Sequence, residues 1–298
     1  MLKVPKRYWQ IAKRLTTAQL QKESANNQYI NELELFNVDI GKRGHGFLLG
    51  YYSKEGIKLA LEKYGIIEYL HSIGFKNLMF EVDTSDAYVH KLSIFDKIKD
   101  GQHLLVELVL KKKFVTISMP FKTPLNGKKL ELLAIEWMCL QNPATSFNEQ
   151  KKQLPGQKYP GLGMASKAVE LLIIMAWRLK LGGLANTPDH FHNAYLYSKI
   201  FFYQDPKDQA KLQALARDTE HYPLHVVAWA MEWGLVQDKI QNEPVLWQST
   251  EQIVPLDNQL KNIFNSNDYR RLVKKYMKQY KFELDYQAFK NKMRSGYQ

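Results

Sequence analysis

Closely spaced β-rich or apolar runs between Leu78 and Leu140 constrain the fold of this chain more than any other feature. The runs cover residues 78–82, 104–110, 114–119 and 130–140. The dipeptides Asp100-Gly101 and Asn126-Gly127 supply turns between them. Consecutive strands at these intervals imply a largely antiparallel sheet.

Helical patterns lie on both sides of these strands. Residues 6–36 have a helical pattern, and Ser53 is placed to cap an amphipathic helix whose apolar positions include Ile57, Leu61 and Leu70. An apolar helical run follows over 164–177, and short strands near Leu184 and Phe201 would extend the sheet. The sequence therefore predicts an α+β fold with a mixed, mostly antiparallel sheet flanked by helices.

Three regions are expected along the chain: a helical N-terminal region over 1–76, a core over 77–205, and a helical C-terminal extension over 206–298. The extension is expected to contain helices over 207–219 and 224–236, a loop marked by Pro244, Trp247 and Pro255, and a final helical block over 257–294.

The composition indicates a soluble cytoplasmic protein. The chain has 298 residues, 45% of them hydrophobic, which is enough for a large core. Its single cysteine, Cys139, cannot form an internal disulfide and fits a reducing compartment. No apolar run approaches the length of a membrane span, so no membrane partner is expected.

The formal charge of +12 is concentrated in the last residues. From Arg270 onward the sequence contains nine basic residues and only two acidic ones, Glu283 and Asp285, and five aromatic residues lie among the basic ones. This tail is either a terminal helix that packs its aromatics on the body, or a surface that binds a polyanion or nucleic acid.

A glycine-containing turn, Lys158-Tyr159-Pro160-Gly161-Leu162-Gly163, opens directly into the helical run that starts at Met164. The glycines allow a ligand to approach the backbone, and the helix directs unpaired N–H groups and its positive dipole end toward the turn. The pattern predicts a site for a phosphate or pyrophosphate. A second glycine-rich turn, 41–46, contains two cations but does not run directly into a helix, so it is the weaker candidate.

The segment after that helix makes a family resemblance visible. The chain resembles the GNAT acetyltransferase superfamily, whose acyl-CoA loop reads Gln/Arg-x-x-Gly-x-Gly/Ala before a helix, and whose next helix ends in Tyr-x-x-x-Gly-Phe. Gly161 and Gly163 match the glycines, Tyr197 the tyrosine and Phe202 the final aromatic. Lys158 replaces Gln or Arg, Phe201 replaces the exit glycine, and residues 142–160 separate the strand from the loop. The resemblance covers about 130–203.

The resemblance implies an N-acyltransferase in which an amine attacks the thioester of acetyl-CoA directly. Tyr197 would then be the acid that protonates the leaving thiolate. The acceptor amine and the acyl chain length are not specified by the sequence. The residues implied to contact the coenzyme are Lys158, Tyr159, Gly161, Leu162, Gly163, Met164, Ala165 and Asn193.

Two residues are candidates for the base. Glu136 lies in an apolar run, where burial would raise the pKa of its carboxyl, although a solvated sheet edge is the alternative. His192 is the other candidate, because histidine titrates near neutrality.

Other chemistries find less support. His190 and His192 could ligate zinc, as could His221 and His225, but there is no cysteine cluster and no His-Glu-x-x-His, so no metal is expected. The chain has no Gly-x-Ser-x-Gly and no P-loop pattern. Besides the acyltransferase, a non-catalytic GNAT-like module that binds CoA, or that binds a polyanion or protein, remains as the alternative function.

Overall fold

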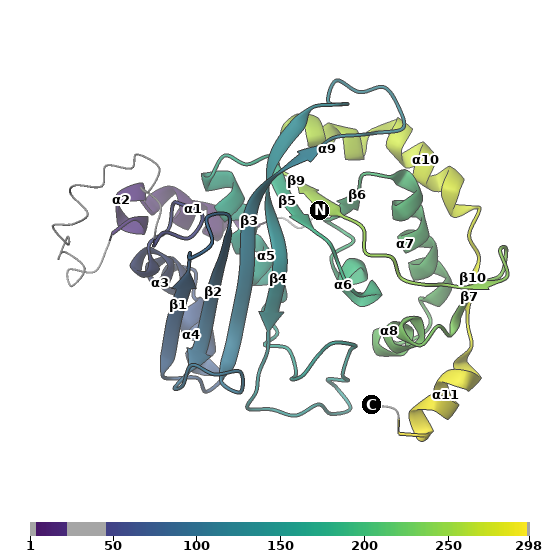
Figure 1. Cartoon of the computed structure of the whole chain (residues 1–298), viewed down its shortest axis with the longest axis horizontal. Helices are drawn as coiled ribbons and strands as arrows, with labels where there is room; N and C mark the ends of the chain where they lie inside the picture. The colour runs from purple at the N-terminus through teal and green to yellow at the C-terminus, as the bar shows by residue number, and fades with distance from the viewer. Residues whose placement is uncertain (1–3, 23–45, 297–298) are drawn as a thin grey trace.

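The computed structural model describes residues 4–22 and 46–296, and Figure 1 shows their arrangement. The N-terminal helices are α1 (Lys6–Arg14), α2 (Thr17–Leu20), α3 (Lys54–Lys63) and α4 (Ile66–Ser72). The Ser53 hydroxyl accepts a hydrogen bond from the N–H of Gly56 at 2.9 Å, which confirms the expected cap. The helix expected after Ser53 is divided in two at Gly65. Residues 23–36 of the expected helix over 6–36, and the turn 41–46 apart from Gly46, fall outside the described residues. The described part of that helix is divided into α1 and α2.

Seven strands form the main sheet, in the order β1-β2-β3-β4-β5-β9-β6. All neighbouring pairs are antiparallel except β4 and β5, which are parallel. The mixed, mostly antiparallel sheet expected from the sequence is therefore confirmed. The strands are β1 (Leu78–Asp83), β2 (Val89–Asp96), β3 (Leu104–Thr116), β4 (Lys129–Leu140), β5 (Gly183–Asn186), β6 (Phe202–Tyr203) and β9 (Gln252–Pro255).

The strands differ from the expected ones in two places. The strand β2 was not expected, although its buried residues alternate with partly exposed ones at its start. Three consecutive lysines, 111–113, lie inside β3, where two separate runs were expected. Lys111 pairs with Glu136, and Lys113 with Glu251, so opposite charges allow the strand to continue through the basic segment.

Helix α5 (Ala165–Arg178) connects β4 to β5, and the sheet is packed on both faces at this point. Leu132 and Leu133 are adjacent in β4 and therefore point to opposite faces, yet both are fully buried. Leu133 belongs to the cluster formed with α1–α5, whereas Leu132 belongs to the cluster formed with α9 and α10. The middle of β4 is thus held rigidly between two hydrophobic cores.

The C-terminal region, expected to be a helical extension, also contains strands. It contains α7 (Pro206–Thr219), α8 (Leu224–Glu232), α9 (Asn258–Asn265), α10 (Asn267–Met277) and α11 (Tyr286–Arg294), preceded by α6 (Phe191–Leu196). A second sheet, β10-β7-β8, combines β7 (Val236–Asp238), β8 (Glu243–Pro244) and β10 (Phe282–Leu284). Strand β9, where a loop was expected, lies between β5 and β6 of the main sheet. A Cβ at Gly183 would lie 2.2 Å from the Val254 carbonyl oxygen, so the close pairing of β5 with β9 requires glycine at this position.

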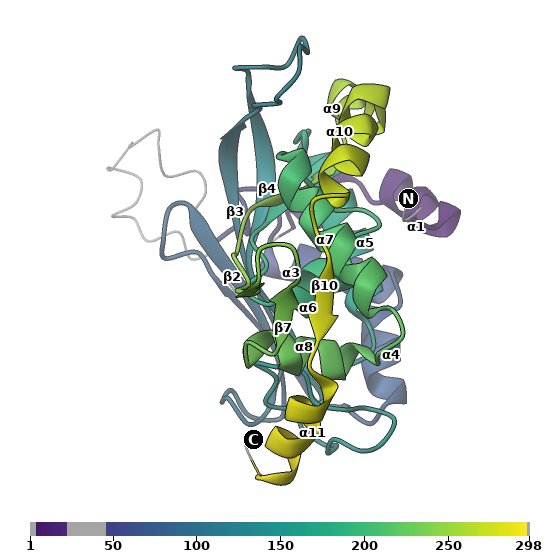
Figure 2. The ribbon, with the colours of Figure 1, turned by 90° about the vertical axis from the view of Figure 1, so that its right-hand side faces the viewer.

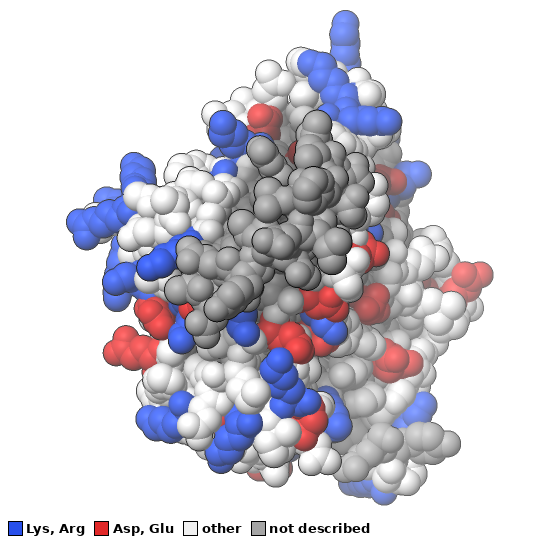
Figure 3. Space-filling model, turned by 60° about the vertical axis from the view of Figure 1, so that its left-hand side comes forward, with Lys and Arg blue, Asp and Glu red and all other residues white. Residues whose placement is uncertain are grey.

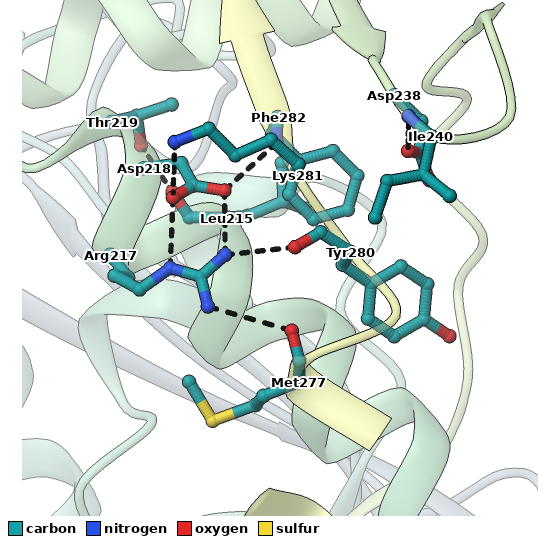
Figure 4. Close-up of polar contacts among 10 residues, drawn as sticks. All are labelled: Leu215, Arg217, Asp218, Thr219, Asp238, Ile240, Met277, Tyr280, Lys281 and Phe282. Atoms are coloured by element: carbon teal, nitrogen blue, oxygen red, sulfur yellow. Dashed lines mark hydrogen bonds and ion pairs between the residues drawn. The ribbon is translucent and has the colours of Figure 1, made fainter. Parts of the chain in front are cut away.

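A buried carboxylate fastens the last part of the chain to α7 (Figure 4). The Asp218 side chain is only 5% exposed; it accepts from the N–H of Phe282 at 2.8 Å and pairs with Arg217. Arg217 also donates to the Tyr280 carbonyl at 2.9 Å, and Lys281 lies 3.7 Å from the carboxylate. Charges from both segments meet at this carboxylate, so the start of β10 is fixed in place.

The basic tail packs mainly as a structural segment. Phe282, Leu284 and Phe289 are buried in the C-terminal core, and Val273 is buried against α7 and α9. The aromatics Phe282 and Phe289 are therefore not available to stack on nucleic-acid bases. Figure 3, which shows another face of the molecule, has lysine and arginine side chains around its margin and carboxylates among them, not one uniform basic surface. Figure 2 shows α10, β10 and α11 following one another along the body.

The Asp218 cluster predicts a specific loss of stability in acid. Burial opposes ionisation, but the hydrogen bonds from Arg217 and Phe282 and the charges of Arg217 and Lys281 outweigh it, so the pKa of Asp218 is lowered. This stabilisation is complete above the unfolded-state pKa of about 4 and is lost as the pH falls through the lower folded value. Urea midpoints measured from pH 6 downward should fall more steeply for the parent than for Asp218→Asn. Identical slopes would contradict this assignment.

Candidate functional site

A cavity of about 530 Å³ lies where the main sheet opens between β4 and β5. The two strands pair over only three residues, Leu133–Ile135 with Leu184–Asn186. Beyond this point β4 continues to Leu140, while the chain after β5 turns away toward α6. The cavity is lined by the end of β4, by the loop before α5, and by residues between Asn186 and Phe201. Open ends of parallel strands next to a helix N-terminus are a common location for ligand sites.

The segment of about twenty residues between β4 and the glycine turn leaves the sheet and returns to it. The N–H of Asn142 donates to the Pro160 carbonyl at 2.7 Å, and the N–H of Leu162 donates to the Leu140 carbonyl at 3.2 Å. Both ends of the segment therefore meet at the end of β4. The separation seen in the sequence does not move the glycine turn away from the strand.

Two further contacts hold this segment and the turn. The Tyr69 hydroxyl on α4 donates to the Leu162 carbonyl at 2.6 Å, and the Trp229 indole N–H on α8 donates to the Gln153 carbonyl at 2.9 Å. Neither residue was recognised from the sequence, because each acts on a segment about 75 to 95 residues away in the chain. Only the folded arrangement brings them together.

The turn leads into an uncapped helix. Gly163 has φ +74°, a conformation that favours glycine, and Met164 provides no side-chain cap to the first turn of α5. The first N–H groups of an α-helix have no partner within the helix, so those of α5 are available to an anion in the turn. Its dipole favours the same charge.

Most of the residues expected to contact a coenzyme line the cavity. They are Lys158, Tyr159, Gly161, Leu162, Gly163, Ala165 and Asn193. Met164 does not line it and is the exception, because its side chain is buried in the hydrophobic core. Lys158 is exposed, with its ammonium 5.3 Å from the ring centre of Tyr159.

Tyr197 lines the same cavity at the end of α6. Burial raises the pKa of its phenol to about 12, so the hydroxyl carries its proton at neutral pH. Its ring packs edge-on against Phe201 with the centroids 6.1 Å apart. This arrangement places a neutral proton donor in the cavity wall.

Glu136 also lines the cavity, and of the two alternatives left open by the sequence, the exposed one is observed rather than the buried one. The carboxylate is exposed and lies 3.1 Å from the Lys111 ammonium. The pairing shifts from Val109–Trp137 to Leu110–Ile135, so Glu136 is the extra residue of a β-bulge. The bulge places Glu136 outside the packed layer, which the apolar residues around it in the sequence do not reveal.

His192 reaches the cavity wall from α6 and is only 3% exposed. Burial and the neighbouring charge of His190 lower its pKa to about 4, so the imidazole does not titrate near neutrality as expected. Its Nδ1 atom has no hydrogen-bond partner among the residues that the structure describes. His192 is therefore a neutral polar group in the wall and a weak base.

Three lining residues on β3 and β4 were not assigned from the sequence. Glu107 is half-buried beside Cys139, and Trp137 is 49% exposed at the bulge. Burial, with the charge of Glu107, raises the pKa of the Cys139 thiol, which therefore stays protonated rather than acting as a nucleophile. The alternation of side chains along 106–108 and 137–139 predicts which residues share a face of the sheet. It does not show which of the two faces borders a cavity.

Two features are missing from the described part of the chain. Within residues 4–22 and 46–296, no three His, Cys, Asp or Glu side chains come close enough to hold a metal ion. The described helices include none that is both long and apolar enough to cross a membrane.

The structure thus defines a mixed α+β protein with a cavity at the opening of its main sheet. Comparison with models of known protein families gave no match, and comparison with curated proteins also gave none.

Proposed function

We propose that this protein is an acyl-CoA-dependent N-acyltransferase of the GNAT type that transfers an acyl group, with acetyl-CoA as donor, to an amine. The observation that carries the proposal is the shared cavity: the glycine turn, the uncapped start of α5, and Tyr197 all border the same space of about 530 Å³. A helix N-terminus suits a pyrophosphate, and the rest of the cavity leaves room for a thioester and an acceptor.

The proposed reaction uses few protein groups. A neutral amine attacks the thioester carbon, the C–N bond forms, and the C–S bond breaks. The amine proton leaves to solvent, while the departing thiolate takes a proton from Tyr197, which is later reprotonated. Most of the acceleration would come from holding the two substrates in line within the cavity.

Replacing Gly163 by valine tests the coenzyme site. At φ +74° a β-branched residue is strained and would reshape the turn, and its Cβ would lie 3.4 Å from the Tyr69 hydroxyl. Acetyl-CoA at about a hundredfold excess over its Kd should stabilise the parent by roughly 2.7 kcal/mol and the variant not at all. Thermal shift and calorimetry with acetyl-CoA and CoA provide the measurement.

Gly127→Val is the matched control, because Gly127 has φ +79° but lies in the β3–β4 turn, away from the cavity. It carries the same backbone strain and should keep the full response to acetyl-CoA. No thermal or calorimetric response of the parent at millimolar acetyl-CoA would disprove the coenzyme site.

A second function, a non-catalytic CoA-binding module, has one observation in its favour. Neither candidate base has the environment expected of one: Glu136 is exposed and paired with Lys111, and the pKa of His192 is lowered to about 4. Acetyl-CoA binding without transfer to any amine of a broad panel would support this second function.

A further inference from the structure

The charges that line the cavity differ in sign from those of the whole chain. The chain has a formal charge of +12, yet the described residues that line the cavity include the carboxylates of Glu107, Glu136 and Asp189 and only one lysine, Lys158. Glu136 is neutralised by Lys111, whereas no ion pair of Glu107 or Asp189 occurs in the described structure. Unpaired carboxylates in a partly enclosed space attract a cation.

Glu107 and Trp137 lie on the same face of the sheet. Glu107 is directly opposite Cys139, and Trp137 is two residues before Cys139 on β4, so the two side chains are diagonal neighbours. Both line the cavity. An exposed indole face next to a carboxylate is suited to an ammonium group, which can bind the ring by a cation–π contact and the carboxylate by a charged hydrogen bond.

The cavity wall also contains buried polar atoms that lack partners. His192 is 97% buried, and its Nδ1 atom has no hydrogen-bond partner in the described part of the chain. The Oδ1 atom of Asn186, at the end of β5, is buried and likewise has no partner there. An amide oxygen can only accept hydrogen bonds, so the Oδ1 atom of Asn186 is suited to a ligand that donates through an N–H or O–H group.

Glu107 and Trp137 are unsuited to hold the nitrogen that reacts. An amine must be neutral to attack a thioester, and a carboxylate beside an indole stabilises its charged form. From this we infer, on the basis of the proposed function, that the acceptor is a small diamine: one nitrogen reacts, and Glu107 and Trp137 bind the second as an ammonium. The anchoring group keeps its proton throughout, while the reacting nitrogen loses one as the C–N bond forms.

Calorimetric titration of the full chain with 1,5-diaminopentane and 1,5-pentanediol tests the inference. The two probes have the same length, and the second replaces both amines by uncharged hydroxyl groups, so neither of its ends can bind as an ammonium. The parent should bind the diamine at least tenfold more tightly, and Glu107→Gln should bring the ratio close to one. Trp137→Leu should also reduce the ratio, and because Trp137 is half exposed this variant is expected to fold even if Glu107→Gln does not.

Two control variants match these changes outside the cavity. Glu62→Gln removes an exposed carboxylate on α3, and Trp177→Leu removes an indole that is 45% exposed on α5. Both should keep the parental ratio. Equal affinities of the parent for the two probes, or a ratio unchanged in both Glu107→Gln and Trp137→Leu, would overturn the inference.

Acetyl-CoA is titrated separately in the same samples, so that the two proposals are distinguished. A normal response to acetyl-CoA with equal affinity for both probes would reject the diamine and leave the acyltransferase standing. A preserved preference for the diamine without any response to acetyl-CoA would reject the acyltransferase and support the ammonium site alone.

Discussion

Tyr197→Phe is expected to slow acyl transfer by roughly a hundredfold to ten-thousandfold, the range for losing a general acid, while acetyl-CoA binding stays nearly unchanged. The substitution keeps the ring against Phe201 and removes only the hydroxyl that would protonate the thiolate. Because burial raises the pKa of Tyr197 to about 12, the acid stays protonated through neutral and mildly alkaline pH. The rate should therefore show no fall near pH 10, where an ordinary tyrosine would ionise.

Tyr195→Phe provides the control for this experiment. Tyr195 lies on the same helix, is half-buried, packs on Phe191, and does not line the cavity. Steady-state turnover and coenzyme titration should both match the parent. A parental rate for Tyr197→Phe would contradict the assigned role, and a loss of coenzyme binding would make Tyr197 a packing residue.

Removal of residues 270–298 should prevent the C-terminal half from folding. The deletion removes the buried side chains of Val273, Phe282, Leu284 and Phe289, and it removes the β10 partner of β7. Truncating one large buried side chain costs about 2–5 kcal/mol, so losing four costs about 8–20 kcal/mol, as much as or more than the roughly 5–15 kcal/mol by which most proteins are stable. Solubility and far-UV circular dichroism of the truncated chain provide the measurement.

The polyanion alternative is tested without deletion. Lys274, Lys275 and Lys278 are exposed on and just after α10, and their replacement by glutamine should leave the melting temperature within a few degrees. If the tail binds polyanions, this triple variant will bind heparin more weakly than the parent at low salt. Equal heparin affinity, together with a truncated chain that does not fold, would make the tail purely structural.

The local features of the fold were predictable where a short segment determines its own structure. The cap at Ser53, the helix over α5 and the strong strands β1 and β4 follow from side-chain chemistry and periodicity. Strand β9 has only four residues and depends on pairing with β5, nearly 70 residues earlier, so its own sequence carries no clear signal. The only trace of that contact is Gly183, which also fits a simple turn.

The candidate site shows the same division. The glycine turn and Tyr197 were recognised because their spacing is local, and the structure places both at one cavity. The sequence left the exposure of Glu136 open, because it depends on a bulge against β3. The pKa of His192 was misjudged, because it depends on packing around α6. Glu107 was missed because the sequence does not show that its face of the sheet borders the cavity. These properties depend on neighbours that are distant in the sequence.

The hydrogen bond between Asn142 and Pro160 closes the segment between them into a loop that can vary independently of the rest of the site. Since both of its ends are fixed at the tip of β4, the segment can be shortened, lengthened or exchanged while the glycine turn keeps its place. Residues in the second half of the segment, such as Leu154 and Gly156, border the cavity. Sequence changes in this one segment can therefore alter which ligands fit the cavity while the glycine turn and α5 keep their positions. The segment is thus a suitable place to engineer a new specificity.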